Sequence, residues 1–526
     1  MAFYLTKPIK IALGEDVNAA NVKIAKHLRL REKDIKSVRL HKQSIDARNK
    51  SDVHFVCSYV VESDKIPVDA SPYSEPTDVL LNAKAQSTRK KCLVIGAGPA
   101  GLFCALYLAK SGATVTVIER GSDVDKRAQT VKNFFDGGEF DEKCNVQFGL
   151  GGAGTFSDGK LTTGISSPLT YTVFQQLFRS GAPKDILTSS LPHVGTDKLT
   201  TVVANLCDEI KQYGGEFLFD TTVDEFLTEN GRVVGVKLDD GNRIFADFTV
   251  LACGHSARKT FERLSHVGAN IAFKPFAVGL RIEHPRQFIN TAQYGAILAT
   301  HRDLPAASYK LVHNGASHSC YSFCMCPGGI VVAANSETDT VVVNGMSNYA
   351  RDAQNSNSAL VVNVTAEDVK EYGFGSDAFA GVRFQQYLEK QAYLLVGGNY
   401  LAPSQNVTDF LANRPTKTFD LSPSYPRGVA SVNLRNLLPD VISDTLAEGL
   451  YEFDRKIKGF GSNSVLTAVE SRTSSPIKIL RNELFQSNLK GLYPIGEGAG
   501  YAGGIVSSAV DGLRVAIAIV EQSRDL

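Results

Sequence analysis

The stretch KCLVIGAGPAGLFCALYLAKSGATVTVIER, residues 91–120, decides the fold of this chain. Residues 92–95 are an apolar run short enough for a buried parallel strand, and residues 113–118 form a second such run. The apolar pattern at residues 102–110 between them predicts a helix. Since a strand, a helix and a second strand follow one another here, the sequence predicts a βαβ unit and an α/β fold.

The turn between the first strand and the helix has the spacing G-x-G-x-x-G. Gly96 permits the tight turn, Gly98 lets backbone N–H groups approach a pyrophosphate, and Gly101 lets the helix pack closely on the sheet. Glu119, at the end of the second strand, is placed to accept hydrogen bonds from ribose hydroxyls. A ribose-binding acid argues against a 2′-phosphate, so this unit predicts FAD or NAD and does not distinguish them.

Composition and charge favour a large soluble enzyme. The chain has 526 residues, 43% of them apolar, and a formal net charge of +1, so no general attraction to polyanions is expected. Nine cysteines without zinc-type pairing indicate reduced thiols in a cytoplasm. No signal peptide, membrane span or metal-ligand spacing is found in the sequence, so we expect a cytoplasmic protein with neither a membrane partner nor a metal.

The N-terminal region differs from the rest in charge. Residues 1–50 hold twelve Lys or Arg against five Asp or Glu. Residues 1–62 are predicted to form a small basic α+β domain of ferredoxin-like type, followed by a linker at 63–90 that contains three prolines. One hypothesis is that this domain docks RNA or a protein partner. The scarcity of aromatic residues favours instead a solvated domain that covers the substrate cleft or the subunit interface of a homo-oligomer.

The remainder is expected to divide into three segments. Residues 91–266 are predicted to form the first part of a Rossmann-like three-layer domain, with an inserted β-meander around the turn at 239–242. Residues 267–461, rich in strands, tyrosines and amide-containing loops, are predicted to form a mixed α+β substrate domain. Residues 462–526 are expected to return to the dinucleotide domain and to end in a helix.

Two further glycine-rich loops point to a flat ligand. The loop FGLGGAGTFSDGKLTTG, residues 148–164, has side chains too small for a core element, so its backbone is expected to approach something closely, such as a flavin ring. The loop GEGAGYAGG, residues 496–504, precedes the closing helix. The N–H groups at the start of that helix would stabilise negative charge on a reduced flavin.

A combination of segments in fixed order gives the chain a family resemblance. These segments are GAGPAG with Glu119, GGAGTFSDGKL, LACGHSAR, CMCPGG at 324–329, NGMS at 344–347, ESRTSSP at 470–476 and GEGAGYAGGI. Over almost its whole length the chain resembles the largely uncharacterised bacterial FAD-dependent dehydrogenases. The resemblance implies a flavin fold of the glutathione-reductase type, a small basic N-terminal domain, and FAD rather than NAD as the cofactor.

The resemblance also implies roles for individual residues. The diphosphate would be held by Gly96, Gly98, Pro99, Ala100 and Gly101, and the adenosine ribose by Glu119 with Arg120 beside it. The flavin ring would be flanked by Gly152, Gly154, Thr155, Ser157 and Lys160, with Gly254 and His255 closing over the cofactor and Glu497, Gly503, Gly504 and Ile505 at the ribityl chain and pyrimidine. Many flavoproteins of this kind have Asp where Glu497 stands, so a water can bridge there.

Three residues are candidates for catalysis. Because flavin N5 accepts the hydride itself, the protein has to orient a small-molecule substrate, exclude water and move a proton. Arg472 is a candidate to clamp a carboxylate or phosphate, with a structural ion pair, for instance to Glu470, as the alternative. Lys160 is a candidate to contact N5 or stabilise the anionic ring, against a solvated loop lysine. His255 is as well suited to a structural hydrogen bond as to proton transfer.

Other reaction types stay open. A flavin-dependent monooxygenase is the alternative enzyme, since residues 254–258, GHSAR, resemble a G-x-S-x-R pattern, although the terminal loop lacks the Asp and His typical of that class. No second G-x-G-x-x-G follows a strand, so either NAD(P)H binds transiently or the substrate couple exchanges electrons with another carrier or with oxygen. Redox activity of the C-x-C pair Cys324 and Cys326 is also open. Against it, disulfide reductases of this fold place C-x4-C after the first helix, where this chain reads GGAGTFSDG without a cysteine.

Overall fold

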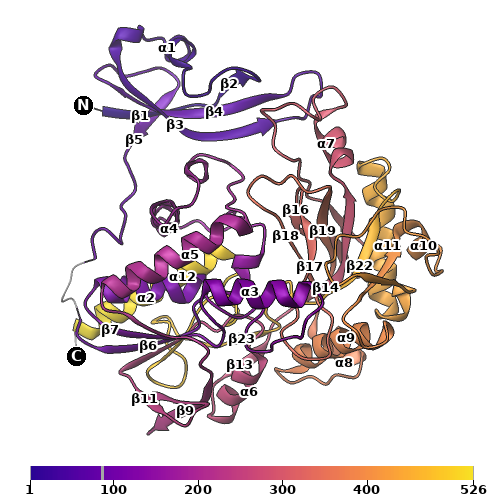
Figure 1. The fold of residues 1–526 in the computed structure, drawn as a ribbon. Coiled ribbons are helices and arrows are strands. Elements are labelled where there is room, and N and C mark those ends of the chain that lie inside the picture. Colours follow the sequence, from indigo (N-terminus) through magenta and orange to yellow (C-terminus); the bar gives the residue numbers. More distant parts are fainter. Residues whose placement is uncertain (1, 84–87, 525–526) are drawn as a thin grey trace.

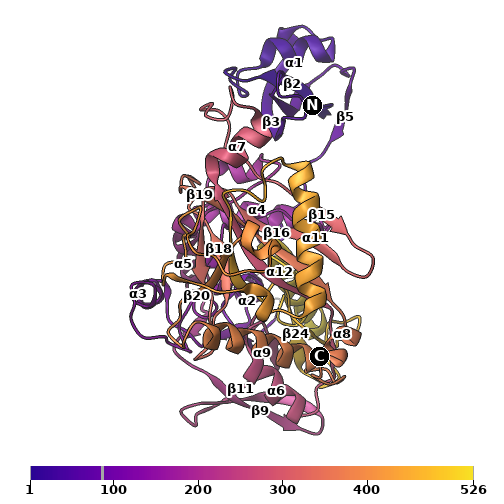
Figure 2. The same cartoon turned by 90° about the vertical axis from the view of Figure 1, so that its right-hand side faces the viewer.

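The computed structural model describes residues 2–83 and 88–524, and three larger sheets organise them (Figure 1). The first belongs to an N-terminal unit, the second is parallel, and the third has seven strands. Figure 2 shows the N-terminal unit at one end of an elongated molecule. None of the described helices is both long and apolar enough to cross a membrane.

The N-terminal unit is a five-stranded antiparallel sheet with one α-helix. Its elements are β1 (Ala2–Thr6), β2 (Ile9–Ala12), α1 (Asn21–Leu28), the 3₁₀ turn η1 (Glu32–Asp34), β3 (Ile35–Asp46), β4 (His54–Ser63) and β5 (Ala70–Tyr73). Strand β4 is central because it pairs with β1, β2 and β3. Alternate residues of β4, such as Cys57, Tyr59 and Val61, point into a core against α1.

Two expectations for this region are corrected. A ferredoxin-like unit has the order βαββαβ with two helices, whereas the order here is ββαβββ with one α-helix. The segment expected to be a linker, 63–90, supplies β5, which pairs with β1 before the chain crosses to the body. Its residues 84–87 lie outside the described residues. The apolar signal of β5, ASPY, is too weak to predict a strand from sequence.

The parallel sheet has the strand order β24-β12-β6-β7-β8, as expected for a Rossmann-like domain. Its elements are β6 (Lys91–Ile95), α2 (Pro99–Lys110), β7 (Thr114–Ile118), α3 (Val124–Phe135), η2 (Gly152–Phe156), α4 (Leu169–Arg179), η3 (Lys184–Leu187), α5 (Thr196–Gln212), β8 (Glu216–Leu218), β12 (Phe248–Leu251), α6 (Arg258–His266), β24 (Leu492–Pro494) and α12 (Ile505–Arg524). Helices α2, α5 and α12 cover one face of the sheet. Both faces are buried, which explains why its strands are continuous apolar runs.

The opposite face carries the predicted β-meander. Strands β9 (Val223–Glu229), β10 (Arg232–Leu238) and β11 (Arg243–Phe245) are antiparallel, and they pack with α6 on the parallel sheet through residues such as Phe226 and Val236. Helices, parallel sheet and meander therefore form three layers. The prediction of a three-layer α/β domain with an inserted meander is confirmed.

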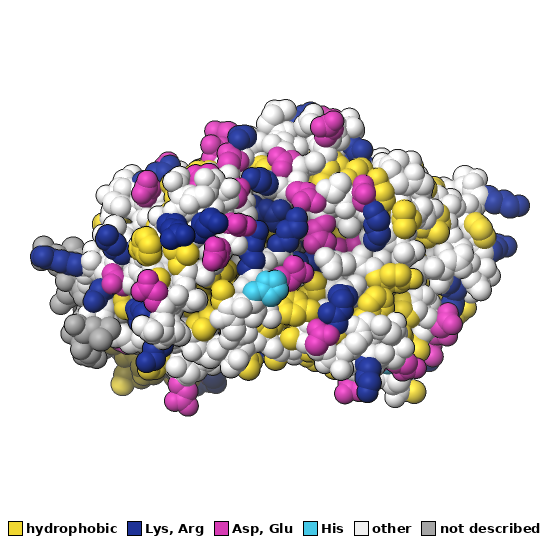
Figure 3. Space-filling view, turned by 90° about the horizontal axis from the view of Figure 1, so that it is seen from below, with side chains coloured by type: hydrophobic (Ala, Val, Ile, Leu, Met, Phe, Trp, Pro, Cys, Tyr) yellow, Lys and Arg dark blue, Asp and Glu magenta, His cyan; other side chains and the backbone are white. Residues whose placement is uncertain are grey.

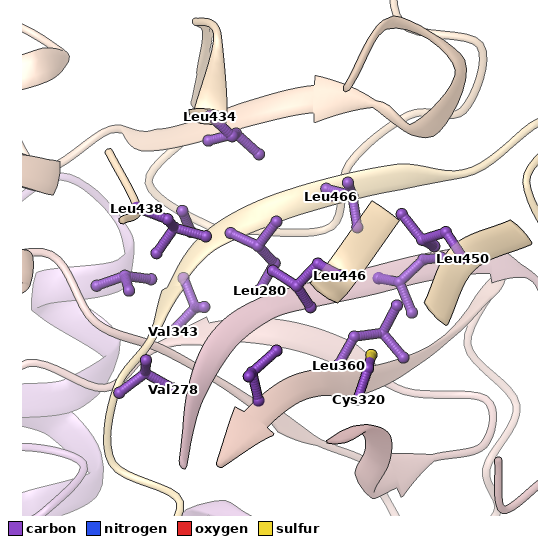
Figure 4. Close-up of a cluster of buried hydrophobic side chains, with 14 of the residues drawn as sticks. Val278, Leu280, Cys320, Val343, Leu360, Leu434, Leu438, Leu446, Leu450 and Leu466 are labelled. Carbon is purple, nitrogen blue, oxygen red and sulfur yellow. The ribbon is translucent and has the colours of Figure 1, made fainter. Parts of the chain in front are cut away.

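The seven-stranded sheet has the order β15-β16-β19-β14-β22-β20-β21. Elements of this region are β13 (Ile271–Phe273), β14 (Phe276–Pro285), α7 (Arg286–Tyr294), β15 (Val312–Asn314), β16 (Ser319–Cys326), β17 (Ile330–Ala333), β18 (Val343–Met346), β19 (Asn355–Val364), α8 (Ala366–Glu371), α9 (Ala380–Leu395), β20 (Ala402–Asn406), α10 (Val407–Leu411), β21 (Val429–Ser431), η4 (Leu434–Asn436), α11 (Asp440–Lys456), β22 (Val465–Glu470) and β23 (Ile477–Ile479). Leucines of α11 pack on the sheet, as Figure 4 shows for Leu446 and Leu450 above Leu280 and Leu360.

Strand β22 corrects a predicted boundary. It follows residue 461, where the chain was expected to return to the dinucleotide domain, yet it lies between β14 and β20 in the seven-stranded sheet. The return therefore comes after β22, where Ile477 and Ile479 of β23 share a core with the parallel sheet and the meander. Glu470, at the end of β22, thus lies where the chain passes from the seven-stranded sheet to the parallel-sheet domain.

The N-terminal unit is joined to the body by backbone hydrogen bonds as well as by the chain. The N–H of Gln43 on β3 donates to the carbonyl of Thr188 (2.7 Å), and the N–H of Ser190 donates to the carbonyl of Gln43 (2.8 Å). Lys50 contacts the carbonyl of Gln293, at the end of α7. These contacts fix the unit against the body, beside α7 (Figure 2).

Candidate active site

A cavity of about 600 Å³ runs from the carboxyl edge of the parallel sheet to the edge of the seven-stranded sheet. Parallel sheets of this type bind ligands at the carboxyl ends of their strands, and the volume lies within the range of cofactor sites, about 300–1,000 Å³. On the face of the molecule seen in Figure 3, Lys and Arg side chains gather in a central depression with a histidine beside them.

The glycine end of the cavity, defined by Gly96, Gly98, Pro99 and Glu119, is built from backbone. Gly96 has φ +105°, and a Cβ there would lie 2.4 Å from the carbonyl oxygen of Ala252. Helix α2 begins at Pro99 after Gly98, and no side chain caps it, so its first N–H groups are free for an anion. This end can hold a diphosphate.

Gly101 and Thr155 do not line the cavity. A Cβ at Gly101 would lie 1.9 Å from the carbonyl oxygen of Gly96, so this glycine serves the close packing of helix on turn. Thr155 is buried, and its carbonyl accepts a hydrogen bond from the Thr196 hydroxyl. The other predicted site residues line the cavity: Gly96, Gly98, Pro99, Ala100, Glu119, Arg120, Gly152, Gly154, Ser157, Lys160, Gly254, His255, Arg472, Glu497, Gly503, Gly504 and Ile505.

Glu119 is already engaged with backbone. Its carboxylate accepts hydrogen bonds from the N–H groups of Ala97 (2.8 Å), Gly121 (3.0 Å) and Gly149 (2.9 Å). A carboxylate offers about four acceptor positions, so about one is left for a ribose hydroxyl. Glu119 therefore ties the first glycine turn to the second glycine-rich loop as well as facing the cavity.

The second glycine-rich loop is held by Arg127 of α3, a residue that the sequence analysis missed. Arg127 is 1% exposed and donates to the carbonyl oxygens of Asn145, Val146, Gly149, Leu150 and Gly152, at 2.7 to 3.2 Å. A Cβ on Gly149 would lie 2.3 Å from the Arg127 side chain, so only glycine fits at position 149. The loop is thus a fixed wall of the cavity.

The inner end of the cavity, defined by Asp158, Lys160, Cys324, Asn344, Glu470 and Arg472, is built from polar side chains. Asp158 is 1% exposed, receives a hydrogen bond from Nε of Arg351 at 2.9 Å and another from the Ser347 hydroxyl, and lies 3.6 Å from Nζ of Lys160. Burial alone would raise the pKa of Asp158, but these cations lower it to about 2. Asp158 is therefore a fixed anion at neutral pH.

Lys160 keeps its charge but has no hydrogen-bond partner among the described residues. Burial lowers the pKa of Lys160, and nearby acidic groups, Asp158 among them, outweigh burial and raise it. Buried donors almost always form hydrogen bonds, so an ammonium beside a cavity that has an ion-pair partner but no hydrogen bond indicates a ligand atom in that cavity. Of the alternatives for Lys160, the geometry favours the contact with a ligand over a solvated lysine.

Arg472 is not available as a substrate clamp. Its Nε and NH2 groups donate to Glu389 of α9 at 3.0 and 2.7 Å, and its NH1 group donates to the Ser256 hydroxyl at 3.0 Å and to Ser336. Arg258 binds the same carboxylate at 2.8 Å through each of two nitrogens. Arg472 is therefore a structural ion-pair residue, with Glu389 rather than Glu470 as its partner.

Glu470 pairs instead with Arg281 of β14. The Arg281 guanidinium donates to both Glu470 oxygens, at 2.8 and 3.2 Å, and to Asn344 and Asn357. Burial raises the pKa of Glu470 even though Arg281 opposes the shift. Asn344 lies in the quoted segment NGMS and was not singled out from sequence, although a polar residue directly after the apolar run 341–343 is a usable signal.

His255 forms a pair with Glu497. Nδ1 of His255 lies 3.4 Å from Oε1 of Glu497, whereas Nε2 is buried without a partner among the described residues. A carboxylate on one ring nitrogen fixes the orientation of the ring and leaves the other nitrogen for a proton transfer or a ligand. The segments after β12 and β24 bring the two residues together across the strand ends.

The cavity fits FAD on two independent observations. A Cβ on Gly254, Gly503 or Gly504 would meet no atom within 4 Å, so these glycines leave room that a ligand can fill. Three buried nitrogens border the cavity and have no hydrogen-bond partner within the described parts of the chain: Nε of Arg120, Nζ of Lys160 and Nε2 of His255. These nitrogens are spread along the cavity, as an extended ligand requires.

The basic residues of the N-terminal unit are mostly neutralised locally. Seven of the twelve form ion pairs with acidic residues: Lys7, Lys10, Lys23, Arg31, Lys36, Arg39 and Arg48. Exposed pairs of this kind contribute little to stability, but each one lowers the field available to phosphates. RNA docking by the N-terminal unit stays a prediction. Fewer of the unit's positive charges are left without an acidic partner than the sequence alone indicates.

Family models match three parts of the chain. Residues 275–473 match the model described as FAD-dependent protein, C-terminal domain-like, and residues 91–133 match the model of FAD dependent oxidoreductases. Residues 7–62 match a domain of unknown function. The matches fall on the seven-stranded sheet, the first βαβ unit and the N-terminal unit.

Two curated relatives differ in coverage. An uncharacterised protein of Clostridium beijerinckii is 43% identical over 528 residues, which covers 98% of both chains. The digeranylgeranylglycerophospholipid reductase of Haloferax volcanii is 26% identical over 171 residues, which covers 31% of this chain and 35% of the reductase.

Solved structures resemble the chain more distantly. The flavin-dependent brominase Bmp2 is 13% identical, with a TM-score of 0.38 over 84% of this chain and 80% of the brominase. The L-proline dehydrogenase of P. horikoshii is 15% identical, with a TM-score of 0.35 over 83% of this chain and 94% of the dehydrogenase. TM-scores at this level carry no argument about the reaction.

Proposed function

Because the chain belongs to the family of its clostridial relative and carries FAD-dependent oxidoreductase domains, it is an FAD-dependent oxidoreductase, and we propose that it transfers a hydride between flavin N5 and a small molecule. One observation above all supports the proposal. A single cavity connects the backbone cradle of the glycine end to the polar wall of the inner end, with unpaired nitrogens at several points along it.

The proposed binding mode follows from the chemistry of the lining. The N–H groups at the start of α2 and the turn at Gly98 hold the diphosphate, and Glu119 accepts a hydrogen bond from the ribose. Helix α12 begins at Ile505, directly after Gly503 and Gly504, so its positive end faces the pyrimidine side of the ring. Bound FAD then supplies the hydride acceptor, N5.

The chain's own residues have three proposed tasks at the inner end. Lys160 places a positive charge beside the ring or an anionic group of the substrate. His255, held by Glu497, exchanges a proton through its free Nε2. Asn344 on β18 and Glu470 on β22 line the same cavity and orient the substrate.

The test is anaerobic photoreduction of the bound flavin, followed by a metabolite screen for reoxidation, with NADH and NADPH screened as donors to the oxidised enzyme. We expect one small molecule to reoxidise the flavin without oxygen. Consumption of NADPH coupled to incorporation of an oxygen atom into a substrate would instead establish the monooxygenase alternative. His255→Gln is expected to slow substrate turnover and flatten its pH profile while FAD stays bound.

A further inference from the structure

Two cysteines occupy the wall of the cavity in an arrangement that the proposed hydride transfer does not use. Cys324 lines the inner end, and Cys326 lies directly behind it with no exposed surface. Both belong to β16, and both are free thiols in the structure. Their sequence spacing alone gives no reason for them to interact.

A β-bulge brings the two cysteines together. Phe323 and Cys326 of β16 pair with Ala359 and Asn357 of β19, so three residue steps on one strand cover the length of two on the other. The backbone of Cys324 has φ 43°, a left-handed conformation that residues other than glycine seldom adopt. The chain is therefore contracted between these cysteines, and a strained backbone of this kind is often found at functional sites.

The surroundings of Cys324 favour a reactive thiolate. The Cys326 thiol donates a hydrogen bond to the carbonyl oxygen of Cys324 at 3.4 Å. The Cys326 side chain and the nearby charges of Lys160 and Arg281 lower the pKa of Cys324 well below its ordinary value. The pKa of Cys326 is raised by its interaction with Cys324 and by burial. The Arg281 guanidinium also donates to the carbonyl of Cys324 at 3.2 Å. Cys324 is thus the thiolate of the pair, and Cys326 is the thiol that keeps its proton.

We propose that Cys324 and Cys326 form a redox-active dithiol that exchanges two electrons with the FAD bound in the cavity. In the oxidising direction, which starts from the Cys324 thiolate and the Cys326 thiol, the Cys326 S–H bond breaks and one S–S bond forms. The two electrons and the proton from Cys326 pass to the flavin, so no further proton has to leave. Cys324 is the sulfur on the cavity side, and Cys326 closes the disulfide from behind. The proposal rests on FAD binding but not on the identity of the small-molecule substrate.

The pair would give the enzyme a second two-electron store beside the flavin. Lys160 has a defined part in this arrangement, since its ammonium lies near both the Cys324 thiolate and Asp158. It stabilises the thiolate while electrons reside on the sulfurs. The arrangement differs from the C-x4-C pair of disulfide reductases because the cysteines come from the seven-stranded sheet rather than from the first helix region.

The electron capacity of the holoenzyme tests the proposal without any substrate. Anaerobic titration of the oxidised, FAD-loaded protein with dithionite should consume four electrons per flavin in the wild type and two in Cys326→Ser. Cys320→Ala is the matched control, because Cys320 lies on the same strand, is fully buried and does not line the cavity. It should consume four. Two electrons in the wild type would overturn the proposal.

A mass measurement on the wild type covers the case in which Cys326→Ser fails to fold or to bind FAD. The oxidised holoenzyme, denatured in iodoacetamide, should carry two fewer carbamidomethyl groups than the reduced holoenzyme. Peptide mapping should show that the two missing groups are those of Cys324 and Cys326. Equal labelling before and after reduction, or loss at any other cysteine, would overturn the proposal. A flavin that binds normally but finds no substrate would count against the proposed function only.

Discussion

The glycine end of the cavity consists of backbone and small side chains from one continuous βαβ unit, whereas the inner end consists of buried charges from segments far apart in the chain. At the glycine end, Gly96 and Gly101 allow contacts that no Cβ would permit. At the inner end, Asp158 meets Arg351 and Arg472 meets Glu389 through side chains. Binding of a common diphosphate therefore depends on shape, while the environment of the reacting ring depends on paired charge.

The largest effect is expected at the glycine end. Gly101→Ala would place a Cβ 1.9 Å from the carbonyl oxygen of Gly96, so we expect a loss of more than about 4 kcal/mol in the free energy of unfolding of the apoprotein. Gly503→Ala is the control, because its Cβ meets nothing within 4 Å. Urea denaturation should separate the two variants, and equal stability would show that the turn tolerates side chains.

The next effect tests the buried ion pairs of Glu389. Glu389→Gln would leave Arg472 buried without an anion and Arg258 with Glu337 alone, and we expect a loss of about 3 kcal/mol in unfolding free energy. The exposed Glu448→Gln serves as a control and should change it by less than about 0.5 kcal/mol. If Glu389→Gln unfolds at the same urea concentration as the wild type, the triad is not needed for stability.

Asp158 gives a pH-dependent test of the inner end. Its pKa is lowered from 3.8 to about 2 in the folded protein, so its contribution is present above the unfolded value and is lost as the pH falls from about 4 to 2. At pH 7 the Asp158→Asn variant should be less stable than the wild type by about 2 kcal/mol, and the gap should shrink below pH 4. A gap that stays constant with pH would contradict this account.

The smallest expected effect is on the midpoint potential of the bound flavin. Lys160→Met removes the inner-end cation that has no hydrogen-bond partner among the described residues, so the reduced flavin should lose stabilisation, and its midpoint potential should fall by about 30 mV, equivalent to about 1.4 kcal/mol for two electrons. Spectroelectrochemical titration with a reference dye measures the shift. The exposed variant Lys259→Met, at the rim of the same cavity, should leave the potential unchanged.

The same contrast explains what could be predicted from the sequence. The glycine end was predictable because Gly96, Gly98, Gly101 and Glu119 lie in one local unit whose spacing has a direct geometric meaning. The meander could be predicted from its turn at 239–242.

The inner end could not be predicted in the same way. The partners of Arg472 and Asp158 are 83 and 193 residues away, so no local pattern identifies Glu389 or Arg351. Arg127 was missed for a similar reason: an arginine in an amphipathic helix gives no sign that it will be buried among five carbonyl oxygens. The short strand β5 and the position of β22 depend on tertiary pairing rather than on local propensity.

The most direct test of the central claim is the flavin content of the purified protein. We expect a yellow protein that releases one FAD per chain on denaturation, a Gly98→Trp variant that folds without colour because the indole fills the cavity, and an exposed Ala412→Trp control that stays yellow. A well-folded, colourless wild type that takes up no added FAD would contradict the account.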